Sequence, residues 1–150
     1  MQQATVETPT GPVTVTAEAG AIVGLRWARG GNDRTPLLDE AARQLDAYFA
    51  GTLRTFSLPL APKVTGFQRD FLDLLRAIPY GETRTYGEIA RDLGVSAQAI
   101  GQACGANPIP IFIPCHRVLA ANGLGGFSGG AGVETKVALL KREGAAGLLI

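Results

Sequence analysis

The first third of the chain alternates apolar and polar residues, a pattern typical of strands that bury one face. The alternation runs through residues 4–8 and 13–17, and a third, more apolar segment follows at 22–27. Residues 9–12, with the sequence Pro-Thr-Gly-Pro, supply turn residues between the first two segments. We therefore expect a small antiparallel meander.

A helix is predicted to follow these strands. Thr35 is a suitable N-cap and Pro36 a suitable first helical residue, and apolar residues then recur at helical spacing up to Phe49. This helix should end near Gly51. The next segment, 53–62, contains two prolines and predicts a strand that runs into a linker.

Helical periodicity dominates after residue 63. Thr65 and Gln68 fit a capping box, in which each side chain satisfies a backbone N–H of the other residue, and Thr85 and Glu88 fit a second one. The helix that starts at the second box should be short, because Gly94 is placed to terminate it.

A third helix after residue 63 is expected over 97–104 with Ser96 as its N-cap. Together with the preceding helix it forms a helix-turn-helix pattern. Most of its side chains are small, so its backbone can approach another surface closely. The alternative is that this small-residue face packs against a neighbouring helix.

Three further segments complete the chain. The apolar run 109–113 predicts a buried strand that ends at Pro114. Residues 123–130 form a Gly-rich loop with one aromatic residue, and they lack the lysine that a phosphate-binding P-loop requires. A final helix is expected over 133–143 with Gly144 as its cap.

These elements predict an α+β fold in two lobes, an N-terminal lobe of strands and one helix over 1–62 and a helical C-terminal lobe over 63–150. The composition supports a compact body, because 46% of the residues are hydrophobic and 18% are charged, against about 25% charged in typical globular proteins.

The balance of charge limits the partners. A net charge of +1 and a pI near 7.8 lack the strongly basic signature of a protein that binds many phosphates, so any contact with nucleic acid must be local. No apolar run approaches the roughly 18 residues that a membrane span requires, and the N-terminus lacks the features of a signal peptide. We expect a cytoplasmic protein that does not bind membranes.

Cysteine and histidine are scarce, since the chain contains only Cys104, Cys115 and His116. They are too few for a disulfide framework or a tetrahedral zinc site, so no metal is expected. We interpret Cys104 as a helix-packing residue.

The segment Pro114-Cys115-His116-Arg117 is the strongest candidate for chemistry, because a thiol needs a base or a positive environment to supply thiolate near neutral pH. Consecutive side chains on a strand point to opposite faces. Cys115 and His116 can therefore cooperate only if Pro114 places them in a turn or if a water bridges them. The residues alone leave open a buried, inert cysteine beside a satisfied histidine.

The run from Asn107 to Val118, Asn-Pro-Ile-Pro-Ile-Phe-Ile-Pro-Cys-His-Arg-Val, closely resembles the active-site segment of the O6-alkylguanine-DNA alkyltransferases. With the preceding helix-turn-helix and the trailing Gly-rich loop, the resemblance extends from Gly66 to Glu143. The N-terminal lobe is similar to the ribonuclease-H-like lobe of bacterial members.

The resemblance implies a DNA repair enzyme that acts once, by irreversible transfer of an alkyl group from O6-alkylguanine, or from O4-alkylthymine, to Cys115. His116 would take the thiol proton through a bound water, and Glu143 would orient the imidazole. Tyr86 would donate a hydrogen bond to the departing purine, and Asn107 would hold the turn before the motif. No cofactor is implied.

The resemblance also implies a monomer that binds double-stranded DNA through the minor groove and turns the alkylated nucleotide out into a pocket. The residues expected at the DNA are Thr85, Ala97, Gln98, Ala99, Gly101 and Arg117. Thr85 and Arg117 would support phosphate binding or the helix-turn-helix scaffold. The residues expected to line the pocket are Tyr86, Ile113, Pro114, Gly126, Phe127, Ser128 and Gly129.

Gln98 departs from the family pattern, which has an arginine at this position of the recognition helix. Arginine fills the gap left by a flipped base with a planar cation, whereas glutamine offers an amide without charge. We therefore expect weaker, salt-sensitive DNA binding and weaker support of base flipping.

Two other functions stay open. One is a lesion sensor that holds the flipped base and recruits other repair factors without transfer, although such relatives lack the acceptor cysteine that Cys115 supplies here. The other is a turnover hydrolase or acyltransferase that uses Cys115 and His116, for which the sequence suggests neither an oxyanion hole nor an acyl pocket.

Overall fold

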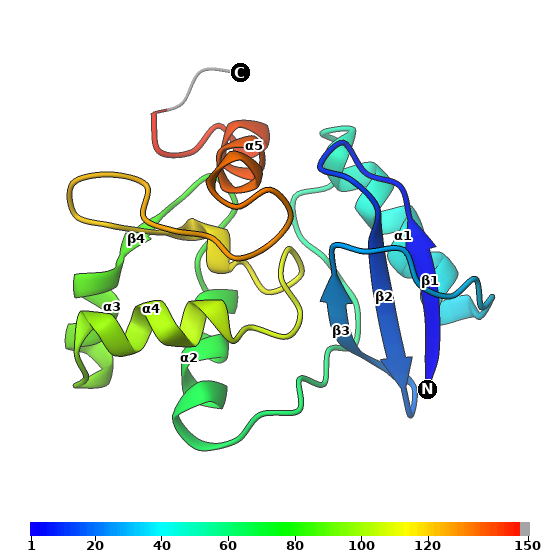
Figure 1. The fold of residues 1–150 in the computed structure, drawn as a ribbon, viewed down its shortest axis with the longest axis horizontal. Helices are drawn as coiled ribbons and strands as arrows, with labels where there is room; N and C mark the ends of the chain where they lie inside the picture. The colour runs from blue at the N-terminus through cyan, green and yellow to red at the C-terminus, as the bar shows by residue number, and fades with distance from the viewer. Residues whose placement is uncertain (148–150) are drawn as a thin grey trace.

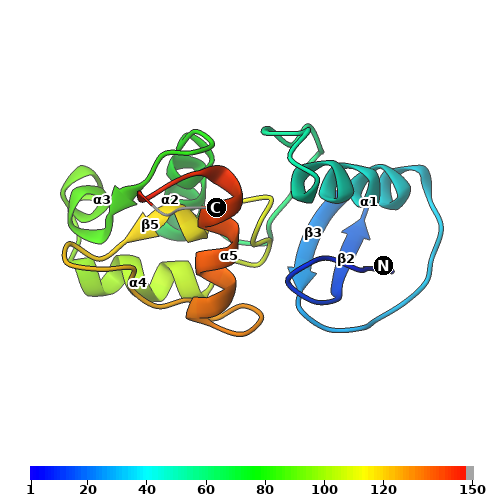
Figure 2. The same cartoon turned by 90° about the horizontal axis from the view of Figure 1, so that it is seen from above.

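The computed structural model describes residues 1–147, which form two lobes (Figure 1). The N-terminal lobe contains strands β1 (Gln2–Val6), β2 (Val13–Glu18) and β3 (Ala21–Arg26), followed by helix α1 (Pro36–Phe49). The strands pair in the order β1-β2-β3 and both pairings are antiparallel, which confirms the predicted meander. Seen from above, α1 lies along one face of this sheet (Figure 2).

Helix α1 begins as the sequence predicts and carries the core of this lobe. The backbone N–H of Leu38 donates to Thr35 Oγ1 at 3.1 Å, and Pro36 is the first helical residue. The apolar side chains that α1 buries recur every three or four residues: Leu38, Ala41, Leu45 and Tyr48. The helix lies against β1 and β2, and its apolar stripe shares one hydrophobic core with the buried side chains of the sheet.

The strand predicted over 53–62 does not form. The segment is coil, and only Leu60 makes an isolated parallel bridge, with Ile22 at the start of β3. The N–H of Ile22 donates to Pro59 O and the N–H of Ala61 to Ile22 O, both at 2.8 Å. The prolines at 59 and 62 have no N–H to continue the ladder, so the segment crosses to the second lobe after this one contact.

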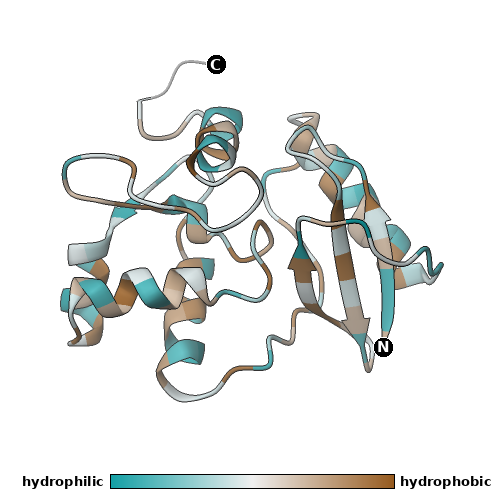
Figure 3. Cartoon of the chain, viewed as in Figure 1, coloured by the Kyte–Doolittle hydropathy of each residue, from teal (hydrophilic) through white to brown (hydrophobic). Residues whose placement is uncertain are grey.

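Up to residue 147, the C-terminal lobe contains four helices, two very short strands and one 3-10 turn. Its elements are α2 (Gly66–Arg76), β4 (Arg84–Thr85), α3 (Tyr86–Leu93), α4 (Ala97–Gly105), η1 (Cys115–Arg117), β5 (Val118–Leu119) and α5 (Val133–Glu143). Hydrophobic and hydrophilic residues follow one another along these helices, as in amphipathic helices (Figure 3). Within residues 1–147, no helix is both long and apolar enough to cross a membrane.

The predicted helix-turn-helix is formed by α3 and α4. Thr85 and Glu88 make the full capping box, with Glu88 N donating to Thr85 Oγ1 at 3.1 Å and Thr85 N to Glu88 Oε1 at 2.9 Å. Gly94 ends α3 in the left-handed conformation, with φ of 70°, and Ser96 caps α4 through its hydroxyl. The sequence signals for this motif therefore correspond to actual backbone contacts.

The capping box predicted at Thr65 is absent. Thr65 precedes α2 but makes no side-chain capping bond, and Gly66 adopts φ of +58°. Gln68 instead donates its amide N–H to Ala103 O at 3.0 Å, which ties α2 to α4. The prediction fails because a tertiary partner outcompetes the local one.

The strand predicted over 109–113 does not form, although the segment is buried as predicted. The segment is a compact turn in which Ile113 N donates to Ile109 O at 2.9 Å and Ile111 has φ of +72°. Pro108 and Pro110 lack the N–H groups that a central strand must donate. The five residues enter the core as a folded turn and not as an extended strand.

We predict that Thr85→Ala lowers the free energy of unfolding by about 1 kcal/mol, because it removes the hydroxyl that caps α3. Urea denaturation of the whole chain measures this loss. Thr65→Ala is the matched control, since Thr65 holds the equivalent position before α2 without a capping bond. It should cost no more than a few tenths of a kcal/mol, and equal losses for the two variants would contradict the role of the capping box.

Candidate active site

The candidate nucleophile lies in a tight turn. Cys115 is the first residue of η1, which Pro114 introduces with φ of −83° and ψ of 67° and which Arg117 N closes by donating to Pro114 O at 3.1 Å. The side chains of η1 therefore do not alternate between two faces. Pro114 places Cys115 and His116 in a turn, which is the arrangement expected to let them cooperate. Cys115, His116 and Arg117 are all buried.

Glu143, at the end of α5, joins the buried polar groups of the site. Its Oε1 accepts from Arg117 Nε at 2.8 Å, and its Oε2 accepts from Arg117 Nη2 at 3.0 Å. The same Oε2 lies 2.8 Å from His116 Nε2 and accepts from Tyr48 Oη at 2.6 Å. Arg117 also donates from Nη1 to Ile78 O at 2.6 Å. The carboxylate is thus fully paired, as a buried charge must be.

The carboxylate is ionised and the imidazole is neutral near pH 7. Burial alone would raise the pKa of Glu143, but the hydrogen bonds and charges of His116 and Arg117 outweigh it and lower that pKa to about 2. Burial holds the pKa of His116 below its ordinary value, although Glu143 acts in the opposite direction. A neutral histidine beside a carboxylate is suited to act as a base.

The tautomer of His116 follows from these contacts. Because Nε2 faces the Glu143 carboxylate it must donate, and Nδ1 then carries the free lone pair. Nδ1 is buried and has no hydrogen-bond partner within residues 1–147. The imidazole therefore offers one unused proton acceptor and is held in orientation from its other side.

The Cys115 side chain rests as a thiol. Burial raises the pKa of this thiol, and the Asn107 side chain and the charge of Lys136 oppose the rise only in part. Nucleophilic attack therefore requires a base. Asn107 also fixes the turn, since its Nδ2 donates to Ile113 O at 2.9 Å and its Oδ1 accepts from Ile109 N at 3.0 Å.

A cavity of about 510 Å³ opens onto Cys115, a size suited to a small aromatic molecule. It is lined by Tyr86, Gly101, Cys104, Gly105, Cys115, Gly126, Phe127 and Ser128. A second cavity of about 300 Å³ shares four of these residues and includes Gly129. The residues expected to line a pocket are therefore brought together, except for Ile113 and Pro114, which are buried in the turn beneath Cys115.

Cys104 lines both cavities and is not simply a packing residue. The helical period could have revealed this, because Cys104 follows Gly101 by three positions and therefore shares its face of α4. Burial raises the pKa of the Cys104 thiol to about 12, so it stays protonated. Cys104 is thus part of the wall beside the candidate nucleophile.

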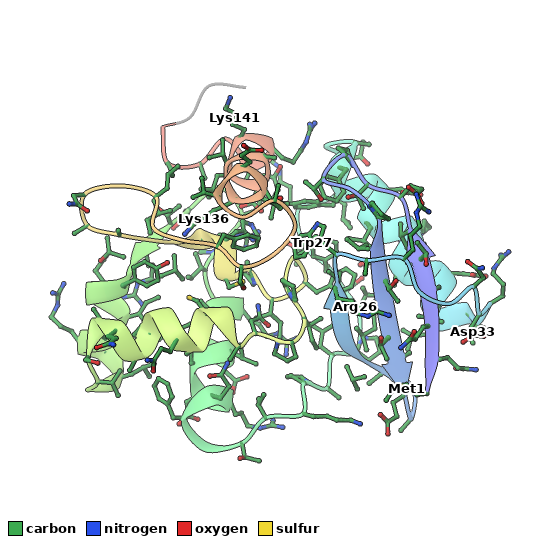
Figure 4. All side chains as sticks on the ribbon, viewed as in Figure 1. Met1, Arg26, Trp27, Asp33, Lys136 and Lys141 are labelled. Atoms are coloured by element: carbon green, nitrogen blue, oxygen red, sulfur yellow. The ribbon has the colours of Figure 1, made fainter. Side chains whose placement is uncertain are left out.

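Lys136 is a second residue that sequence reasoning missed. Its side chain is buried, and Nζ donates to Val118 O at 2.6 Å and to Gly126 O at 3.1 Å (Figure 4). Nζ also lies 5.7 Å from the centre of the Tyr86 ring. Lys136 precedes Glu143 by two helical turns, so the helical period places it on the same face. It ties the Gly-rich loop to the strand that follows the thiol.

The N-terminal lobe supports the rim of the cavity. Trp27, which lies between the lobes in Figure 4, packs edge-on against Phe127 with ring centroids 5.8 Å apart. A Cβ at Gly129 would collide with the Trp27 ring, and one at Gly125 would lie 2.8 Å from the Tyr86 ring. Glycine is therefore required at both positions for the loop to approach these rings.

The residues expected to contact DNA fall into two groups. Ala97, Gln98 and Gly101 are exposed on α4 and Ala99 is partly so, and a Cβ at Gly101 would meet only open space. Thr85 uses its hydroxyl in the capping box, and Arg117 is 7% exposed and bound to Glu143. The structure therefore does not support a DNA contact for Arg117, because its guanidinium is committed to the buried carboxylate.

Comparisons with known proteins agree with this arrangement. Residues 66–145 match the family model described as 6-O-methylguanine DNA methyltransferase, DNA binding domain, and residues 1–62 match the ribonuclease-like domain of the same family. A methylated-DNA--protein-cysteine methyltransferase of Methanosarcina acetivorans is 41% identical over 156 residues, which cover 96% of this chain and 99% of the relative. The constitutive enzyme of that name from Bacillus subtilis is 40% identical and is covered to 93% on both sides.

A solved structure shows the same fold. The crystal structure of Mycobacterium tuberculosis OGT in complex with DNA superposes with a TM-score of 0.85 and 41% identity, over 96% of this chain and 93% of the other. An α+β fold with a ribonuclease-like lobe and a DNA-binding lobe is thereby confirmed. The chain belongs to the 6-O-methylguanine DNA methyltransferase family, as the resemblance of its Pro-Cys-His-Arg segment predicts.

We predict that Lys136→Met lowers the free energy of unfolding by about 2 kcal/mol, because it leaves the buried carbonyl group of Val118 without its donor. Urea denaturation tests this. Lys141→Met is the control on the same helix, since Lys141 is exposed, and it should change stability by less than about 0.5 kcal/mol. Similar losses in both variants would show that the bridge to Val118 and Gly126 adds nothing to stability.

Proposed function

We propose that this protein repairs DNA by moving the methyl group of O6-methylguanine irreversibly to Cys115. The observation that carries the proposal is the position of the Cys115 thiol at a cavity of about 510 Å³, in the same turn as a neutral histidine whose Nδ1 is unused. Membership of the methyltransferase family supports the same reaction. In this proposal the Cys115 sulfur is the nucleophile and the His116 imidazole is its base.

The reaction is a displacement at the alkyl carbon. Sγ of Cys115 forms the new C–S bond while the bond between that carbon and O6 breaks, and its electron pair stays with the purine. The thiol proton moves through a water to Nδ1 of His116, and Glu143 stabilises the resulting imidazolium. Burial raises the pKa of the Tyr86 hydroxyl, so this hydroxyl remains a donor for the departing purine.

The product is a thioether, which has no acidic proton and is a poor leaving group. Neither His116 nor Glu143 can remove the alkyl group from sulfur by accepting a proton. One molecule therefore repairs one lesion, without a cofactor.

The protein binds DNA through its C-terminal lobe, whose family model is a DNA-binding domain. We place α4 in the minor groove of double-stranded DNA, because its exposed residues are small apart from Gln98 and Gln102 and its nine residues include no charged group. Such a helix approaches the bases closely and reads little sequence, which suits a monomer that inspects any guanine. The target base must leave the duplex to reach Cys115, at a cost of a few kcal/mol.

Gln98 lies at the start of α4, where its side chain is exposed. It would meet the space that the flipped base leaves in the stack. An amide fills this space without the charge and the planar fork of a guanidinium. We therefore propose that base flipping is less well supported here than in relatives with arginine at this position.

Intact-mass measurement tests the transfer. After incubation with an oligonucleotide that contains O6-methylguanine, the protein should gain the mass of one methyl group in place of one hydrogen, on the peptide that contains Cys115. Cys115→Ala should abolish both the gain and the repair of the oligonucleotide. Cys104→Ala, the other cysteine at the cavity, should still accept the methyl group.

Other outcomes of this experiment would contradict the proposal. A stable complex with unchanged mass would indicate a lesion sensor, and repair of many lesions per molecule without a lasting adduct would indicate a turnover enzyme. Undiminished repair by Cys115→Ala would remove Cys115 from the reaction.

Gln98→Arg should increase the transfer rate several-fold at saturating DNA, because the guanidinium stabilises the flipped state. Gln102→Arg is the matched control, since it adds the same charge one turn further along the exposed side of α4. It should strengthen binding at low salt but leave the saturated rate unchanged. Single-turnover kinetics at saturation separate the two effects, and equal rates for all three proteins would contradict the role given to position 98.

A further inference from the structure

Tyr48 brings the N-terminal lobe into direct contact with the catalytic carboxylate. It lies in the last turn of α1, 95 residues before Glu143, and its hydroxyl donates to Glu143 Oε2 at 2.6 Å. Both side chains are buried. This hydrogen bond crosses from the ribonuclease-like lobe to the lobe that carries the thiol.

The orientation of the Tyr48 ring is fixed by its neighbours. Phe49, Phe56 and Tyr80 surround it, with ring centroids 5.0, 5.2 and 6.2 Å away. Burial and the charge of Glu143 raise the pKa of the Tyr48 hydroxyl, so the hydroxyl stays protonated. Tyr48 therefore donates to the Glu143 carboxylate as a neutral hydroxyl in a fixed position.

Tyr48 and His116 use the same oxygen atom. Oε2 of Glu143 receives the Tyr48 hydroxyl at 2.6 Å and faces His116 Nε2 at 2.8 Å. Each donor to a carboxylate oxygen stabilises its negative charge and reduces its pull on the next donor. The strength of the Tyr48 bond must therefore affect how readily His116 takes up a proton.

We propose that Tyr48 is a positioning residue for the transfer reaction, through which the N-terminal lobe orients Glu143 and sets the proton affinity of His116. The inference rests on the proposed transfer to Cys115. It gives the N-terminal lobe a part in the chemistry, although none of its residues needs to touch the alkylated base.

Several ionisable groups act on His116, and they come from three elements. They are Arg117 of its own turn, Lys136 and Glu143 of α5 and, through its hydrogen bond to Glu143, Tyr48 of α1. Cys115 precedes His116 in the same turn as a protonated thiol, and Tyr80 packs edge-on against Tyr48. Replacing Tyr48 by phenylalanine removes one neutral donor and leaves every charge in this set in place. The change in His116 can therefore be assigned to the lost hydrogen bond.

Tyr48→Phe should raise the pKa of His116 by about one unit, as expected for the loss of one hydrogen bond to a charged group. The chain contains a single histidine, so NMR of the 15N-labelled imidazole follows this pKa without assignment. The transfer rate should fall about tenfold on the acidic side of its pH profile, because more His116 is already protonated. It should recover toward the unmodified rate as the pH rises.

Two further variants separate this effect from a loss of packing. Tyr80→Phe removes a neighbouring hydroxyl that donates to Arg142 O at 2.9 Å, and it should leave the pKa of His116 and the shape of the pH profile unchanged. A fluorinated tyrosine placed at position 48 keeps the ring and strengthens the donor. It should lower the pKa of His116, the opposite of the phenylalanine substitution.

An unchanged pKa of His116 in both Tyr48 variants would overturn the inference, as would a rate reduced equally at every pH. The NMR measurement uses the free protein and does not depend on transfer. Absence of methyl transfer in the unmodified protein would contradict the proposed function, and the response of the His116 pKa would still decide whether Tyr48 controls its proton affinity.

Discussion

The burial of the Glu143 charge is the constraint on which the site depends. A carboxylate removed from water is stable only if it is fully paired, and its two oxygens here receive the Arg117 guanidinium, the His116 imidazole and the Tyr48 hydroxyl. These partners arrive from η1 and from α1, so the charge can be buried only when both lobes are in place. The same contacts fix the tautomer of His116 and leave Nδ1 free.

Much of the fold could be predicted because its signals are local. The capping residues Thr35, Thr85 and Ser96 and the left-handed Gly94 all depend on near neighbours in the chain, and the structure shows each of them. The Pro-Cys-His-Arg segment was equally informative, because its resemblance to the alkyltransferases implies the chemistry, whereas the thiol and the histidine alone left an inert cysteine open.

The remaining errors arise where distant segments meet. Gln68 bonds to α4 and not to its own helix start, and the apolar run 109–113 folds into a turn because of its prolines. The roles of Lys136 and Tyr48 depend on backbone carbonyls and on a carboxylate far away in the sequence. The same applies to Arg117, which was expected at the DNA but forms a buried ion pair with Glu143, a distant residue in the sequence. The spacing of residues along the chain does not indicate such contacts between distant segments.

The position of Trp27 makes it an intrinsic fluorescent probe of the cavity rim. It is the sole indole in the chain, and its ring touches Phe127 at the rim of the cavity. Indole emission responds to polarity and to contact with nearby groups. Fluorescence of the unlabelled protein therefore reports on the packing of the Gly-rich loop at the mouth of the cavity.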